Sequence, residues 1–91
     1  MKQYSWTMSG MDDYIFDVTA IAYRRLGNYA HARSVTEALR WYIPRANVEF
    51  CKLLAKKSPS AVASILLKGG SIDQQLKRIK RSIGYETEVS V

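Results

Sequence analysis

The chain has 91 residues, of which 47% are hydrophobic and 24% charged, so its size and composition fit one small folded domain and exclude global disorder. Fourteen Lys and Arg residues against eight Asp and Glu residues give a net charge of +6, which favours an anionic partner such as nucleic acid, an acidic protein or a membrane surface. With one cysteine (Cys51), one histidine (His31) and no catalytic motif, we expect no enzyme, no metal site and no cofactor, and a soluble cytoplasmic protein without a membrane span.

Residues 2–8 alternate between polar and apolar side chains, a pattern typical of a half-buried strand. Ser9 and Gly10 are expected to end it. A lone strand leaves backbone groups unpaired, so we expect this one to pair with a second copy of the chain, with residues 85–91 or with a ligand.

The rest of the chain predicts helices. The apolar spacing and the capping residues place them at 12–26, 28–43 (with Ser34 as an alternative start), 45–57, after Ser58-Pro59, and 71–84. In the last of these, Ser71 and Gln74 form a capping-box pattern ahead of a regular apolar stripe. The predicted fold is therefore mainly α, with a short N-terminal strand followed by about five helices.

The positive charge is concentrated in the second half of the chain. Residues 1–50 hold six basic and five acidic residues, whereas residues 51–91 hold eight and three. The densest basic run lies on the last predicted helix, at Lys77, Arg78, Lys80 and Arg81.

The order of strand, helix, glycine turn at Gly27 and second helix ending in Glu37-Ala-Leu-Arg-Trp-Tyr-Ile43 resembles the ribbon-helix-helix family of DNA-binding repressors, over about residues 2–43. In that family two strands pair across a dimer axis, and the ribbon enters the major groove. The resemblance implies a homodimeric unit at 1–43 and a helical extension at 44–91, packed on the same domain.

The resemblance also implies roles for individual residues. Base contacts would come from Gln3, Ser5 and Thr7, whose side chains have suitable donors and acceptors. Contacts to the DNA backbone would come from Asn28, Tyr29 and Ala30 at the start of the second helix. Outside the resemblance, positive charge alone predicts further backbone contacts by Lys2, Arg33, Lys77, Arg78, Lys80 and Arg81. The dimer core would hold Tyr4, Trp6, Met8, Val35, Leu39 and Tyr42.

Three functions remain open from the sequence. The first is a small sequence-specific regulator or plasmid or phage accessory factor that binds double-stranded DNA as a homodimer or higher oligomer. The second is a small helical protein that docks on a larger protein machine and inhibits or adapts it, with residues 44–84 as a possible partner surface. The third is a helical RNA-binding module that uses Lys77 to Arg81 without the strand.

Overall fold

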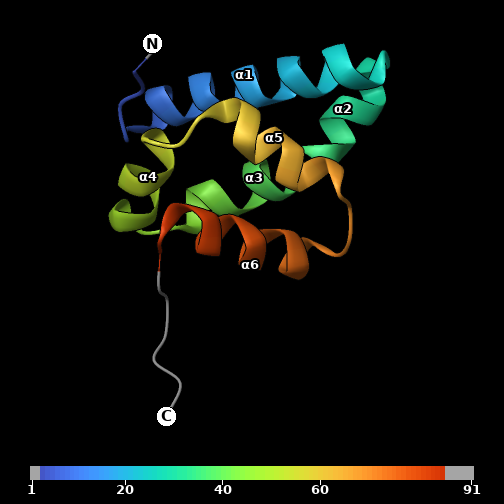
Figure 1. Ribbon diagram of the computed structural model, residues 1–91. Helices are drawn as coiled ribbons and strands as arrows, with labels where there is room; N and C mark the ends of the chain where they lie inside the picture. Colours follow the sequence, from blue (N-terminus) through green and yellow to red (C-terminus); the bar gives the residue numbers. More distant parts are fainter. Residues whose placement is uncertain (1–2, 86–91) are drawn as a thin grey trace.

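A computed structural model describes residues 3–85 of the protein (Figure 1). These residues form six α-helices and one short 3-10 turn, and this part of the chain holds no strand. The elements are α1 (Met8–Leu26), α2 (Tyr29–Val35), α3 (Glu37–Tyr42), η1 (Ile43–Arg45), α4 (Val48–Ala55), α5 (Pro59–Leu67) and α6 (Ile72–Ile83). The prediction of a mainly α fold is confirmed, and the predicted N-terminal strand is wrong.

The segment predicted as a strand leads into α1 instead, and we call its described residues before the helix, 3–7, the lead-in segment. Thr7 caps the helix, and its hydroxyl oxygen accepts a hydrogen bond from the Gly10 N–H at 3.3 Å. The Tyr4 ring packs edge-on against Tyr14, with centroids 5.0 Å apart, and its hydroxyl donates to the Asp17 carboxylate. These contacts hold the segment on its own helix, so the paired ribbon of the resemblance is absent from the described residues. The predicted pairing with the C-terminal end falls mainly on residues 86–91, which lie outside them.

Gly10 permits this close approach. A Cβ atom at position 10 would lie 2.1 Å from the Ser5 carbonyl oxygen, far inside van der Waals contact. We expect Gly10→Ala to lower the free energy of unfolding by about 1–3 kcal/mol, because the lead-in segment must move away from α1. Urea denaturation measures this. Ser9→Ala, an exposed position in the same turn, should change stability by less than about 0.5 kcal/mol, and equal losses at both positions would contradict the steric explanation.

The single helix predicted over 28–43 is broken at Thr36. The Thr36 hydroxyl lies 3.0 Å from the Thr19 hydroxyl and donates to the Ala32 carbonyl oxygen at 3.1 Å. The Arg40 guanidinium donates to Thr36 Oγ1 at 2.8 Å. A buried threonine that bonds backbone and neighbouring side chains competes with regular helical hydrogen bonds. The chain therefore turns between α2 and α3, and this turn lies against α1.

The later helices agree better with the sequence. Ser58 caps α5 with Pro59 at its first position, and Ser71 and Gln74 form the complete capping box of α6. Gly84 ends α6 in the left-handed conformation. The helix predicted from residue 45 begins at Val48, because Asn47 caps it and the 3-10 turn η1 takes up the preceding residues.

The helices are arranged around one core (Figure 1). Helix α1 packs against α2, α4 and α5, whereas α6 packs on the other side against α3, α4 and α5. The buried side chains come from both halves of the chain: Met11, Tyr14, Val18, Leu39, Phe50, Leu54, Val62, Leu66, Leu76 and Ile79. Within residues 3–85 no helix has both the length and the apolar character needed to cross a bilayer.

Candidate nucleic-acid interface

The three side chains expected to read bases do not project from a ribbon. The Thr7 hydroxyl caps α1 and lies 2.7 Å from the Ser5 hydroxyl, so both take part in local hydrogen bonding. Gln3 lines a surface depression between the lead-in segment and the turn after α4, together with Lys56 and Lys57. Because residues 3–85 hold no strand, the geometry on which base reading by these residues depended is missing from the described part of the chain.

The residues expected at the DNA backbone are divided between distant parts of the fold. Asn28 caps α2, and its side-chain oxygen accepts a hydrogen bond from the His31 N–H at 2.8 Å. Tyr29, Ala30 and Arg33 are exposed on the same short helix, beside the C-terminal end of α1 and away from α6 (Figure 1). Lys2 lies outside the described residues.

The residues expected in a dimer core have other neighbours. Leu39 is fully buried inside the single chain, with Val35, Tyr42 and Tyr4 packed around the same core. Trp6 and Met8 are exposed at the start of α1. The apolar spacing of Val35, Leu39 and Tyr42 therefore serves the core of one chain, whereas Trp6 and Met8 are not part of that core.

The basic residues of α6 have two orientations. Its core face holds Leu76, Ile79 and Ile83, so the basic residues lie on the remaining surface. Lys77, Lys80 and Arg81 are spaced i, i+3 and i+4, which places them on one face of the helix. Arg78 turns the other way, and its guanidinium donates to the Gly69 carbonyl oxygen at 2.7 Å.

A chain of aromatic rings lies beside this basic face. Tyr42 packs edge-on against Phe50, with ring centroids 4.9 Å apart, and Phe50 packs edge-on against Tyr85 at 5.5 Å. The Trp41 ring lies 6.4 Å from the Tyr42 ring. We call Trp41, Tyr42, Phe50 and Tyr85 the aromatic ladder. It joins α3 to α4 and to the end of α6, and the Asn47 side chain fixes it by donating to the Tyr85 hydroxyl at 2.8 Å.

Two cations lie over the rings of the aromatic ladder. The Lys80 ammonium is 4.8 Å from the centre of the Tyr42 ring, and the Arg45 guanidinium is 4.6 Å from the centre of the Trp41 ring. Such contacts are favourable because the ring face is electron-rich. The ladder thus carries Arg45 of η1 over one ring and Lys80 of α6 over the neighbouring ring, and Lys77 and Arg81 extend the positive charge along α6.

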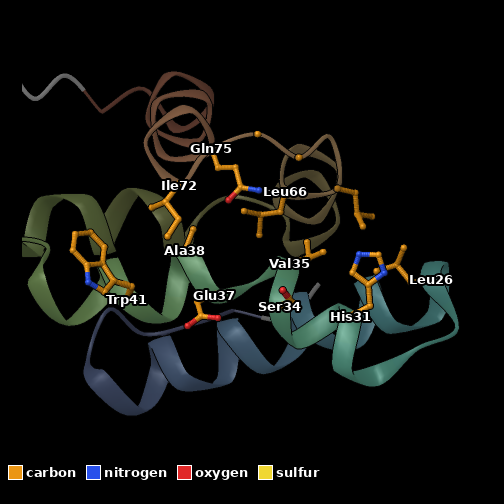
Figure 2. Close-up of a pocket in the computed structure, with 13 residues that line it drawn as sticks. Leu26, His31, Ser34, Val35, Glu37, Ala38, Trp41, Leu66, Ile72 and Gln75 are labelled. Carbon is orange, nitrogen blue, oxygen red and sulfur yellow. Dashed lines mark hydrogen bonds between the residues drawn. The ribbon is translucent and has the colours of Figure 1, made fainter.

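Trp41 also stands at one end of a pocket of about 460 Å³ between α2–α3 and α5–α6 (Figure 2). Val35, Ala38 and Leu66 give the pocket an apolar floor, and His31 lies at the end opposite Trp41. Polar atoms of Ser34, Glu37 and Gln75 lie along its edges. The pocket offers apolar contact and hydrogen bonding, but none of the described residues that line it is a Lys or an Arg.

The remaining reactive or basic groups near the core have structural contacts. Arg25 donates to the Ser64 and Ser60 hydroxyls of α5, at 2.8 and 3.0 Å. Cys51 is buried, and burial raises the pKa of its thiol, so it remains protonated at neutral pH. Among residues 3–85, no three His, Cys, Asp or Glu side chains are grouped so that they could hold a metal ion.

Sequence reasoning identified the basic residues of α6 but missed Trp41, Arg45 and Tyr85. The ladder is assembled by tertiary contacts between positions up to 35 residues apart, Phe50 to Tyr85, and local periodicity does not report such contacts. One local signal was available, because Trp41 and Arg45 are four residues apart at a helix end. No protein-family model, curated protein or solved structure matches the chain.

Proposed function

We propose that the protein binds single-stranded nucleic acid through the aromatic ladder and the basic face of α6. The observation that carries the proposal is the pair of cations over two ladder rings, Arg45 on the exposed Trp41 and Lys80 on the partly buried Tyr42, next to Lys77 and Arg81. This is a form of the RNA-binding hypothesis from the sequence, in which the basic helix works without a strand.

The basic face supplies the electrostatic part of binding. Lys77, Lys80, Arg81 and Arg45 are four cations on neighbouring elements, and residues 50–85 contain one carboxylate, Asp73, against eight Lys and Arg residues. Neutralising about four phosphates of a single strand gives a slope of about −2.8 in a plot of log affinity against log salt. Raising the salt from about 50 to about 200 mM should then weaken binding about 50-fold.

The exposed part of the ladder supplies the contact with bases. Aromatic rings and arginine planes stack on unpaired bases of any sequence, whereas the bases of a duplex are stacked on each other and unavailable. The pocket beside Trp41 adds an apolar surface with polar edges next to the stacking position. We therefore expect tighter binding to a single strand than to a duplex of the same length.

Trp41 and Trp6 form a matched pair for testing the stacking site. Their exposed fractions are 46% and 47%, and a cation lies over each ring, Arg45 over Trp41 and Lys52 over Trp6. Trp41→Ala should weaken binding to an oligothymidylate of about 20 nucleotides by about 5- to 150-fold, since one stacked base is worth about 1–3 kcal/mol. Trp6→Ala should leave the affinity within about 3-fold of the unchanged protein.

Fluorescence anisotropy of a labelled oligonucleotide measures both affinities. If the two substitutions weaken binding equally, the bases do not stack on the ladder. If the unchanged protein prefers the duplex, or binds neither nucleic acid in low salt, the proposed function is wrong.

A further inference from the structure

A second surface, on the side of the fold away from α6, combines exposed aromatic rings with arginines. It is a groove of about 370 Å³ between α1 and the α2–α3 pair, which we call the α1 groove. Phe16 and Tyr23 line it from α1, and Tyr29, Arg33 and Arg40 line it from the other side. None of these residues belongs to the aromatic ladder.

The aromatic side chains of the α1 groove are unusually open to solvent. Phe16 is 72% exposed, although it lies in the middle of the longest helix, and Tyr23 and Tyr29 are also exposed and pack edge-on at 6.0 Å. The positions of Phe16 and Tyr23 are i and i+7, with the small Ala20 between them. Large side chains flanking a small one form a depression that accepts the apolar side chains of an amphipathic helix. Tyrosine and arginine are also the residue types enriched where such contacts contribute most energy.

The wall of the α1 groove carries positive charge that is fixed in place. The Arg40 guanidinium donates to Thr36 Oγ1 at 2.8 Å and to the Arg33 carbonyl oxygen, and Thr36 in turn contacts Thr19 of α1. Burial, and next the charge of Arg33, lowers the pKa of Arg40. A carboxylate placed between the two arginines relieves their repulsion and accepts charge-assisted hydrogen bonds.

We propose that the α1 groove binds an acidic amphipathic helix of a partner protein, with apolar anchors over Phe16 and Tyr23 and carboxylates at Arg33 and Arg40. The depression over Ala20, between Phe16 and Tyr23, fits an apolar side chain better than a phosphate backbone. A second copy of the chain is a poorer match. A two-fold contact sets the same groove against itself, and each groove holds two arginines for one carboxylate, Asp12. The surface is distinct from the ladder, so this inference stands apart from the proposed nucleic-acid binding.

A random peptide library of about 16 residues, selected on the full chain, tests the α1 groove. We expect enriched peptides with apolar residues at i, i+3 or i+4 and i+7, and with Asp or Glu beside them. Amide shifts of the isotope-labelled chain should map a synthesised peptide to α1, α2 and α3. Failure to enrich such peptides, enrichment of basic peptides, or shifts on α6 would overturn the proposal.

Charge exchange identifies the contact more sharply. Arg33→Glu should weaken binding of the acidic peptide by about 10-fold or more, and a peptide with Lys in place of Glu should bind this variant with the affinity restored. Phe16→Ser should weaken the binding of both peptides. Arg24→Glu, an exposed arginine near the end of α1 that does not line the groove, is the control and should change the affinity by less than about 3-fold.

The remaining outcomes decide between occupants. If Arg33→Glu and Arg24→Glu weaken binding of the acidic peptide equally, the peptide is attracted by the net charge of the chain, and the proposal that it binds in the α1 groove is wrong. If sedimentation shows a dimer that Phe16→Ser dissociates, a second copy occupies the groove instead. If an oligonucleotide moves the groove amides and Phe16→Ser weakens its binding, the groove belongs to a nucleic-acid site. Under the proposal, neither Phe16→Ser nor Arg33→Glu changes oligonucleotide affinity by more than about 3-fold, so the two functions fail or succeed separately.

Discussion

A chain carrying both Lys77→Glu and Arg81→Glu should bind a single-stranded oligonucleotide at least about 100-fold more weakly than the unchanged protein in low salt. Two attractive contacts are lost and two repulsive ones replace them, and a loss of about 2.8 kcal/mol corresponds to this factor. Both side chains are exposed on α6, opposite its core residues Leu76 and Ile79. The thermal unfolding temperature is therefore expected to change little.

The neutral versions of these substitutions separate charge from shape. Lys77→Ala with Arg81→Ala should change the slope against log salt from about −2.8 to about −1.4, because two of about four phosphate contacts disappear. Arg24→Glu with Lys68→Glu changes the net charge by the same amount as Lys77→Glu with Arg81→Glu, but away from the ladder, and is the control for general electrostatics in that variant. An equal loss of affinity in the control pair would show that net charge alone, and not the face of α6, determines binding.

Helix α6 shows what the sequence was able to predict. Ser71 and Gln74 cap its start, Gly84 ends it, and its four apolar residues recur at helical spacing, so all signals are local and agree. The core face follows from the same spacing, which is why Leu76, Ile79 and Ile83 are buried and Lys77 and Arg81 are exposed. Arg78 is the exception, because its partner is the Gly69 carbonyl oxygen in the preceding loop.

The N-terminal segment shows where local signals mislead. A short alternation of polar and apolar residues describes a strand, but it describes equally an extended lead-in whose alternate side chains meet a helix. The features that decide the structure are the Thr7 cap and the close approach of Ser5 to Gly10. Both depend on how the segment packs on α1. The paired ribbon that the resemblance to ribbon-helix-helix proteins implied depended on the strand, so this part of the prediction is wrong together with the strand.

The break at Thr36 and the aromatic ladder could not be predicted from the sequence, for a different reason. Thr36 turns the chain because its hydroxyl meets Thr19 from another helix. The ladder forms because Phe50 brings Tyr42 and Tyr85 together. Such contacts join residues far apart in the chain, and a single sequence holds no local pattern that reports them.

The two phenylalanines of the chain give the second large expected effect, on stability. Phe50 is 0% exposed and packs between the rings of Tyr42 and Tyr85, whereas Phe16 lies open in the α1 groove. Phe50→Ala should lower the free energy of unfolding by about 3–5 kcal/mol, through lost burial and a cavity in the core. The same change at Phe16 should alter it by less than about 0.5 kcal/mol.

Urea denaturation of both variants measures the difference, and Phe50→Leu keeps the experiment interpretable if the alanine variant does not fold. Leucine fills part of the site, so it should fold and lose a smaller part of the stability. Because Phe50 supports the ladder, Phe50→Leu should also weaken oligonucleotide binding while leaving peptide binding at the α1 groove unchanged. If Phe16→Ala lowers the free energy of unfolding as much as Phe50→Ala does, Phe16 supports the fold itself. Its exposure would then give no reason to expect a partner at the α1 groove.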